Sequence, residues 1–447
     1  MNPLASALTT DLYQLTMLHA YFERGMRETA VFELFVRKLP PGRNFLLAAG
    51  LEPALEFLEG LRFAPEELEW IERLGLFGPR FAQDLERLRF TGEVHALPEG
   101  TVFFPNEPVL RVIAPLPEAQ LVESRLINLV HYSTMIASKA ARAVLVAPGK
   151  RLVDFGLRRS HGAEAGLLAA RAAYLAGFAG TSAVSAGMAY GIPVFGTMAH
   201  SFVQAHEDEA RAFEDFARVF PRAATLLIDT YDTEEGARKV AALARRLRAE
   251  GIEIGGVRLD SGDLGTLAKS VRRILDEAGL GSTTIFASGK LDERRVRDLL
   301  AGGAPIDGFG VGTSLVTSDD APHLDAVYKL QEYAGTPRRK RSTGKATWPG
   351  RKQVWRERGA DGRFARDVVS LETESAAGEP LVGRVMAGGR RLRVATLAEA
   401  RSRAAREIDA LPVRLAVLED SAQPYTVTVS PGLEALARQV DAATGGR

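Results

Sequence analysis

Between about residues 150 and 315 the chain alternates short apolar, β-branched runs with segments of helical spacing. Alternation of this kind places the strands in one parallel sheet, because a helix carries the chain back to the same edge each time. Seven consecutive units favour a (β/α) barrel, and an open doubly wound sheet is the alternative. The seven candidate strands are 151–156, 177–182, 192–197, 225–230, 254–260, 283–289 and 306–313.

The segment 264–279 shows the helical half of this pattern most clearly. Its apolar residues stand at positions 264, 267, 268, 271, 274 and 275. That spacing puts them on one face of a helix. We therefore expect an amphipathic helix here.

The sequence on either side of this core differs from it. Residues 1–24 and 51–90 have helical patterns, whereas 30–38 and 92–115 have strand patterns with Pro and Gly turns. A helical segment, 118–145, leads into the core, and a basic loop, 335–356, follows the core. We expect three parts. Residues 1–118 form an N-terminal α/β domain, residues 119–345 form a barrel core, and residues 346–447 form a C-terminal α+β segment that packs back on the first part.

The composition is that of an ordinary globular protein. Of 447 residues, 46% are hydrophobic and 25% are charged, and the formal net charge is +1. Neither nucleic acid nor a membrane is expected as a partner, since no field of one sign and no long apolar stretch is present. The chain has no cysteine and no apparent signal peptide, which is compatible with the reducing cytoplasm that we expect for it.

Small or polar residues follow nearly every candidate strand. In a barrel those carboxyl ends converge on one mouth, where such folds carry out chemistry. A helix cap is the alternative for any one of them, for example Ser182 or Asp263. The convergence of seven strand ends favours a site over seven separate caps. These residues are Asp154, Phe155, Arg158, Thr181, Ser182, Thr197, His200, Ser201, Asp229, Asp232, Arg258, Asp260, Ser261, Ser288, Gly289 and the segment 308–313.

Two glycine-rich segments, "ASGK" (287–290) and "GFGVGT" (308–313), follow the last two strands. Glycines let backbone amides approach an anion, and loops after the last strands of a barrel recurrently bind phosphate. The sequence contains no GxxxxGK[ST] and no HExxH, so neither a P-loop nor that kind of zinc site is expected. His206 is expected on a solvated helix.

Long motifs in order over the first 350 residues make the chain similar to the nicotinate phosphoribosyltransferases, a group related to nicotinamide phosphoribosyltransferase. The motifs are "TDLYQLTM" (10–17), "FELFVRKLP" (32–40), "DFGLRRSHG" (154–162), "FAGTSAVSA" (178–186), "GTMAHSFV" (196–203), "LIDTYDT" (227–233), "GVRLDSGDL" (256–264), "ASGKLDE" (287–293) and "GFGVGTSLVTS" (308–318).

The resemblance implies a reaction. Nicotinate and 5-phosphoribosyl 1-diphosphate give nicotinate mononucleotide and diphosphate in NAD biosynthesis, coupled to ATP hydrolysis through a phosphohistidine. The matching nucleophile is His200, and Asp229 is expected to hydrogen-bond it and fix its tautomer. A core histidine bonded to a backbone carbonyl is the alternative for His200.

The resemblance also implies a base-binding site. Phe155 would stack on one face of the pyridine ring, and Tyr13 of a partner subunit on the other. Arg158 would face the carboxylate, with Thr197 nearby. The nicotinamide-using relative has an aspartate where this chain has Ser182, so Ser182 favours the acid over the amide.

Asp260 and Arg258 resemble the ribose-binding pair, and an anion there stabilises a cationic sugar C1. The family's 5′-phosphate ligands match Ser288, Gly289, Gly310, Gly312 and Thr313. Mg²⁺ would neutralise the diphosphate, mostly through water and substrate oxygens. Further phosphate contacts are expected from Lys139, Arg142 and the basic loop with Arg341 and Lys345, for which a solvated surface is the alternative.

The fold implied by the resemblance is an irregular (β/α) barrel beside an N-terminal α/β sandwich, in a homodimer with shared active sites. Three other functions are the alternatives. A nicotinamide-specific enzyme is disfavoured by Ser182, and quinolinate phosphoribosyltransferase by the ATP-type motif at His200. A silent metabolite sensor would lack His200, Asp229 or Asp260, all of which are present.

Overall fold

The computed structural model describes residues 6–222 and 224–445. The chain forms two compact units, one of residues 1–138 with 323–447 and the other of residues 139–322. The long helix α6 (Glu123–Val146) contains the first boundary. None of the helices in the described residues is long and apolar enough to cross a membrane.

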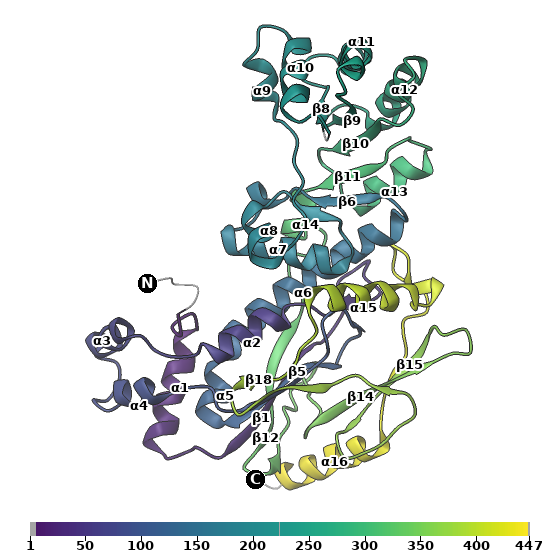
Figure 1. The fold of residues 1–447 in the computed structure, drawn as a ribbon. Helices are drawn as coiled ribbons and strands as arrows, with labels where there is room; N and C mark the ends of the chain where they lie inside the picture. Colours follow the sequence, from purple (N-terminus) through teal and green to yellow (C-terminus); the bar gives the residue numbers. More distant parts are fainter. Residues whose placement is uncertain (1–5, 223, 446–447) are drawn as a thin grey trace. The chain divides into compact units, whose positions relative to one another are not determined.

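The second unit is built on a six-stranded parallel sheet, which is the expected barrel core (Figure 1). All five neighbouring pairs in it are parallel, as the alternation of strands and helices predicted. In spatial order the strands are β7 (Gly180–Thr181), β6 (Arg151–Asp154), β11 (Gly308–Val311), β10 (Thr284–Ser288), β9 (Ile254–Leu259) and β8 (Ala224–Leu227).

The barrel is irregular because one of the seven predicted strands, 192–197, does not form. The run 192–197 contributes one parallel bridge, Val194 to Thr181, and no ladder. Pro193 lacks an N–H, and a strand that cannot donate at its second residue is poorly suited to a central place in a sheet. Within the described residues the sheet therefore stays open between Val194 and β8.

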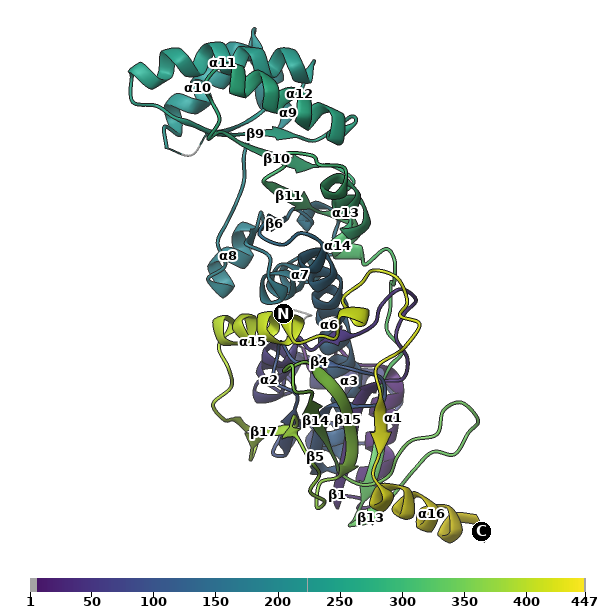
Figure 2. The same cartoon turned by 90° about the vertical axis from the view of Figure 1, so that its right-hand side faces the viewer.

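Helices connect these strands, and α10, α11 and α12 pack next to one another outside the sheet (Figures 1 and 2). The predicted apolar face of α12 is confirmed, since Leu264, Ala268, Val271 and Leu275 are buried. The helices are α7 (Ala163–Ala176), α8 (Val184–Tyr190), α9 (His200–Gln204), α10 (Glu209–Val219), α11 (Thr233–Ala249), α12 (Leu264–Glu277), α13 (Glu293–Ala301) and α14 (Thr313–Thr317), with a 3₁₀ turn at Leu157–Arg159.

The first unit contains a seven-stranded and a four-stranded sheet. The larger sheet joins N-terminal strands to strands from beyond residue 322, so the C-terminal part packs back as expected. Its order is β13 (Thr336–Pro337), β12 (Ala326–Tyr333), β1 (Thr29–Val36), β5 (Pro108–Pro115), β3 (Glu93–Ala96), β17 (Gly383–Ala387) and β18 (Arg390–Arg391); the smaller is β16 (Glu379–Pro380), β14 (Lys352–Arg358), β15 (Phe364–Leu371) and β19 (Val427–Val429).

Helices surround these sheets, and a two-stranded ladder of β2 (Leu46–Leu47) and β4 (Val102–Phe103) completes the unit. The helices are α1 (Leu12–Glu23), α2 (Leu51–Glu59), α3 (Pro65–Leu74), α4 (Phe81–Arg87), α5 (Leu116–Leu121), α15 (Leu397–Asp409) and α16 (Pro431–Gly445), with a 3₁₀ turn at Val413–Leu415.

Buried charges join the two sheets of this unit. Lys352 of β14 lies 2.7 Å from Glu33 of β1, and both side chains are almost fully buried. Within the smaller sheet, Arg356 of β14 pairs with Asp367 of the neighbouring β15 at 2.6 Å. Burial, and next the charge of Asp367, raise the pKa of the neighbouring Glu107 well above its ordinary value. These pairs fix which strands face each other, since leaving one charge unpaired would be costly.

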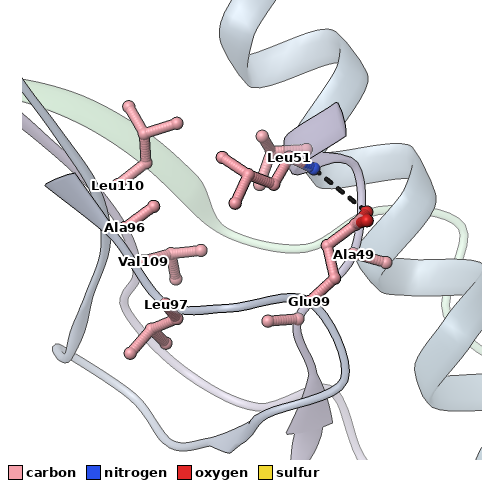
Figure 3. Close-up of a pocket in the computed structure, with 9 residues that line it drawn as sticks. Ala49, Leu51, Ala96, Leu97, Glu99, Val109 and Leu110 are labelled. Carbon is pink, nitrogen blue, oxygen red and sulfur yellow. Dashed lines mark hydrogen bonds between the residues drawn. The ribbon is translucent and has the colours of Figure 1, made fainter. Parts of the chain in front are cut away.

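A small cavity in the first unit lies beside the start of α2 (Figure 3). Its volume is about 10 Å³, room for about one water, and apolar side chains such as Leu97 and Val109 line it. Glu99 Oε1 accepts hydrogen bonds from the backbone N–H groups of Gly50 and Leu51 and so caps α2. This cavity is a packing feature and is too small for a substrate.

Candidate active site

A polar cavity of about 470 Å³ opens at the carboxyl ends of the strands in the second unit. Loops after β6, β9, β10 and β11 contribute its lining, as the convergence of strand ends predicted. Nine of the predicted site residues line it: Phe155, Arg158, Arg258, Asp260, Ser288, Gly289, Gly310, Gly312 and Thr313.

Arg258 is the centre of the hydrogen-bond network in this cavity. Its Nη2 lies 2.7 Å from Asp260 Oδ1, and its Nε donates to Ser288 Oγ at 2.8 Å. Its Nη1 donates to Thr197 Oγ1 at 3.2 Å. Thr197 thus lies behind Arg258 and is not among the lining residues. The guanidinium also lies over the ring of Phe155, 5.4 Å from its centroid.

Asp260 is held as a carboxylate by its neighbours. Burial raises its pKa, but hydrogen bonds from Ser288 and Arg258 lower it by more, so the pKa lies below the ordinary value. The same oxygen, Oδ1, accepts from both groups. The cavity therefore contains a fixed negative charge beside positively charged side chains.

Two glycine loops bring backbone close to this carboxylate and to Phe155. In the first glycine loop (residues 288–292), Gly289 has φ of +89°, and a Cβ there would come within 1.9 Å of the Asp260 carbonyl oxygen. In the second glycine loop (residues 310–313), a Cβ on Gly310 would lie 2.4 Å from the Phe155 ring. Only glycine fits at these two positions.

The Phe155 loop is positioned by Asp154, which is buried at the end of β6. Asp154 accepts hydrogen bonds from Gly156 N at 2.8 Å and from Thr181 Oγ1 at 2.7 Å. Burial raises the pKa of Asp154, although these two hydrogen bonds act in the opposite direction. Ser182, which directly follows β7, donates from its backbone N to the carbonyl oxygen of Asp154 at 2.8 Å but is not among the residues that line the cavity.

The expected hydrogen bond between Asp229 and His200 is not formed. His200 Nδ1 lies 3.1 Å from Thr230 Oγ1. Asp229 Oδ2 instead accepts from Asp260 N at 2.8 Å and from Ser261 Oγ at 2.6 Å. Asp229 therefore supports the loop of Asp260, while its buried Oδ1 has no partner among the described groups. Thr230, the residue next to Asp229, therefore makes the hydrogen bond to His200 that was expected of Asp229.

Lys139 and Arg142 do not line the cavity. Lys139 is 2% exposed and Arg142 3%, and both pair with Glu293, at 3.0 and 3.1 Å respectively. Carboxylates thus neutralise both cations. Tyr13 lies on α1 of the first unit and is 49% exposed. Arg341 and Lys345 lie in a loop of that unit, and Asp263 caps α12, which was the alternative for it.

Two further cations line the cavity, Arg159 and Lys290, and neither is among the predicted site residues. Arg159 follows the predicted Arg158 in "GLRRS", and Lys290 follows the predicted Gly289 in "ASGK". Their positions in these two motifs could have indicated them. Lys290 has φ of +51°, an uncommon conformation for a residue other than glycine. With Arg158 and Arg258, four cations and one carboxylate line the cavity, which suits a ligand with several negative charges.

Among residues 6–222 and 224–445, no group of three or more His, Asp or Glu side chains is arranged to hold a metal ion. Asp260 nonetheless lines the cavity, and Asp229, whose Oδ2 accepts from Asp260 N, keeps a buried Oδ1 without a partner among the described groups. One or two carboxylates with substrate phosphates are a usual ligand set for Mg²⁺. The residues present therefore fit an ion that takes most of its ligands from substrate and water.

Comparison with known proteins identifies the family. Residues 8–131 match the model of the nicotinate phosphoribosyltransferase (NAPRTase) N-terminal domain, and residues 150–336 match the nicotinate phosphoribosyltransferase (NAPRTase) family model. The chain is 52% identical to nicotinate phosphoribosyltransferase pncB2 of Mycobacterium tuberculosis (strain ATCC 25618 / H37Rv) over 426 residues, 95% of this chain and 91% of the relative.

It is also 43% identical to the Bacillus subtilis (strain 168) nicotinate phosphoribosyltransferase over 357 residues, which cover 78% of this chain and 73% of that one. In structure it is similar to human nicotinic acid phosphoribosyltransferase, with a TM-score of 0.88, 32% identity, and coverage of 96% and 99% of the two chains. Motifs, fold and relatives agree. The chain belongs to the nicotinate phosphoribosyltransferase family.

Proposed function

We propose that this protein transfers the phosphoribosyl group of 5-phosphoribosyl 1-diphosphate to nicotinate, an early step of NAD biosynthesis, and couples the transfer to ATP hydrolysis. The observation that carries the proposal is the polar cavity, in which an aromatic ring, four cations and two glycine loops surround one carboxylate. Family membership and the names of the relatives supply the substrates.

In the transfer step, the pyridine nitrogen of nicotinate forms a bond to C1 of the ribose as the bond to diphosphate breaks. The sugar gains positive charge in that transition state. Asp260 is held ionised by Arg258 and Ser288 and stabilises this charge. The glycine loops and Lys290 receive the 5′-phosphate, so that C1 is placed relative to Asp260.

The base is recognised at the other end of the cavity. Phe155 offers one ring face, and Arg158 offers a guanidinium to the carboxylate of nicotinate. Ser182, held next to Asp154 by its backbone N–H, is proposed to donate a hydrogen bond from its hydroxyl to that carboxylate, as the family resemblance implies. Tyr13 of a partner subunit covers the second face of the ring in a homodimer, as the family resemblance implies.

In the ATP step, His200 Nε2 attacks the γ-phosphorus of ATP, ADP leaves, and water later hydrolyses the phosphohistidine. Nε2 needs its lone pair, so the ring proton must stand on Nδ1. Thr230 Oγ1 is placed to accept a hydrogen bond from that Nδ1–H. In this proposal Thr230 takes the role first expected of Asp229.

Neutralisation of the leaving diphosphate is the chemistry that a bound Mg²⁺ supplies. Asp229 Oδ1 and the carboxylate of Asp260 are the protein oxygens available for direct or water-mediated contact with the ion.

The proposal is tested by mononucleotide formation from 5-phosphoribosyl 1-diphosphate and Mg²⁺ with nicotinate, nicotinamide or quinolinate, each with and without ATP. We expect product from nicotinate alone, in larger amount with ATP. If product forms only from another base, the assignment of nicotinate as the substrate is wrong. If ATP has no effect, the role of His200 is overturned.

Labelling with γ-³²P ATP separates the two steps. His200→Ala should not become labelled but should retain weak synthesis without ATP, because the transfer residues are intact. Undiminished labelling of this variant would place the phosphoryl group on another residue.

A further inference from the structure

Lys139 is buried among three carboxylates in the second unit. Its Nζ lies 3.0 Å from Glu293 Oε2, 3.1 Å from Asp319 Oδ1 and 2.7 Å from Asp320 Oδ1. The Lys139 side chain is only 3% exposed. Burial lowers its pKa, but the charges of Glu293 and Asp320 raise it by more, so that the group stays an ammonium.

The three carboxylates belong to the segments that follow the two glycine loops. Glu293 is the first residue of α13 and directly follows the first glycine loop, which contains Lys290. Asp319 and Asp320 come directly after α14 and Ser318, and α14 begins at Thr313 of the second glycine loop. One ammonium group therefore joins the residue that follows the first glycine loop to the end of the helix that begins in the second.

A second contact joins the same two loops. Ser314 Oγ, one residue after the second glycine loop, donates to the carbonyl oxygen of Leu291 in the first at 2.6 Å, and the bond is buried. Arg142, one helical turn after Lys139 on α6, donates to Glu293 Oε1 at 3.1 Å. The loops are thus connected to each other directly and to α6 through charges.

Direct phosphate binding by Lys139 conflicts with these contacts. Glu293, Asp319 and Asp320 carry three negative charges against the two positive charges of Lys139 and Arg142. A phosphate that approached Lys139 would meet carboxylates first. Such a group can still act on the ligand through the loops, since a small displacement of a binding group can cost on the order of 10²-fold in rate.

We propose that Lys139 is a positioning residue that sets the spacing of the two glycine loops and thereby the affinity for 5-phosphoribosyl 1-diphosphate. The effect on substrate affinity rests on the proposed function, whereas the effect on the spacing of the two glycine loops does not. Arg142 assists by orienting Glu293, which is the residue that both cations share.

The kinetic test uses the full-length enzyme and the variants Lys139→Arg, Lys139→Met and Asp320→Asn. Lys139→Met should raise KM for 5-phosphoribosyl 1-diphosphate by about tenfold or more and leave kcat and KM for nicotinate much less changed. Lys139→Arg keeps the charge and should restore most of the affinity. Asp320→Asn keeps two of the three contacts and should give an intermediate KM.

Asp298→Asn is the matched control, because Asp298 is an exposed carboxylate on α13 that pairs with Arg297 and not with Lys139. It should behave as the unchanged enzyme does. Equal changes in kcat and in both KM values for Lys139→Met and Asp320→Asn would indicate general damage and overturn the proposal. If Lys139→Met does not fold, Lys139→Arg and Asp320→Asn decide the question.

Hydrogen exchange of the backbone amides separates this inference from the proposed function. Lys139→Met should increase exchange in residues 288–293 and also in 312–320, whereas Asp320→Asn should increase it only in the latter. This result does not depend on turnover, so it can stand even if the unchanged enzyme forms no mononucleotide. A raised KM with unchanged exchange in both segments would make Lys139 a direct phosphate ligand and refute the positioning role.

Discussion

At the scale of single residues, the proposed function assigns the choice between acid and amide to Ser182. Ser182→Asp should reduce kcat/KM for nicotinate by about tenfold to a hundredfold, because a carboxylate beside the base repels the substrate carboxylate. The preference should move toward nicotinamide. The measurement is the ratio of kcat/KM for the two bases. Ser182→Ala, which only removes a hydrogen-bond donor, is the control. If the ratio in Ser182→Asp equals that of the unchanged enzyme, the assignment is contradicted.

The partner of His200 is a second question at this scale. Thr230→Val removes the oxygen that lies 3.1 Å from Nδ1. It should slow phosphohistidine formation by about tenfold, since the wrong tautomer becomes populated. Thr230→Ser, which keeps a hydroxyl, should retain the rate. The rate of labelling by γ-³²P ATP distinguishes them. Loss of labelling in Asp229→Asn with no change in Thr230→Val would restore the expected Asp229–His200 bond.

Most residues that line the polar cavity could be predicted from sequence because they end parallel strands, and parallel strands end at one edge. Asp260, Ser288 and Gly310 are of this kind. Lys139 could not be predicted correctly in this way, since sequence spacing does not show which carboxylates a helix will face. The same holds for His200, whose ring contacts Thr230 and not Asp229 because neighbouring side chains at a strand end point in different directions.

At the scale of elements, the first glycine loop depends on a single backbone conformation. Gly289→Ala should destabilise the fold by about 1–3 kcal/mol, because φ of +89° disfavours a side chain and the new Cβ would meet the Asp260 carbonyl. KM for 5-phosphoribosyl 1-diphosphate should rise as well. Urea unfolding and kinetics measure the two effects.

The control for that loop is Gly281→Ala, where the nearest atom to a new Cβ is 3.7 Å away and belongs to a flexible side chain. It should leave both quantities nearly unchanged. If Gly289→Ala matches Gly281→Ala in stability and KM, the close approach to Asp260 is not important.

The junction between the two sheets of the first unit gives a pH dependence. Burial keeps Glu107 protonated when folded, so folding takes up a proton at pH values above the ordinary glutamate pKa. The contribution of this group to stability is complete below that ordinary value and is lost as pH rises through the raised one. Glu107→Gln mimics the protonated acid. Its Tm relative to the unchanged protein should therefore increase from pH 5 to pH 8.

The control is Glu399→Gln, which removes a carboxylate that is not buried. Glu399 is an exposed acid, and hydrogen bonds from Thr396 lower its pKa. The contribution of Glu399 to stability is complete above the ordinary glutamate pKa and is lost only as pH falls below it, so the relative Tm of Glu399→Gln should stay nearly constant from pH 5 to pH 8. Thermal unfolding in buffers across this range gives both values. A flat difference for Glu107→Gln would show that Glu107 is ionised in the folded state.

Among the elements, the alternation of strands and helices was sufficient to predict a parallel barrel sheet but not its opening. The run 192–197 has the composition of a strand, yet it forms one bridge. The number of hydrogen bonds that a short run makes depends on its neighbours on both sides. Pro193 was the only local sign of the irregularity.

At the scale of the whole molecule, the shared site of the expected homodimer can be tested by mixing. Tyr13→Ala and Asp260→Asn should each be nearly inactive. If Tyr13 acts in the partner's site, a mixed dimer has one intact site, and equal co-expression should restore about a quarter of the activity. Light scattering should give twice the 48.3 kDa of one chain. If Tyr13 serves its own chain, mixing restores nothing.

The opening in the sheet also means that the parts of the site differ in their resistance to local unfolding. Residues 196–222 cross the opening as α9 and α10 and belong to no ladder in the described chain. Their release breaks apolar contacts such as those of Phe213 but no hydrogen bond between strands. Release of Asp260 or Ser288 would strip strands from the middle of the sheet. A protease should therefore cut first in residues 196–222, beside His200, and leave β9 and β10 paired.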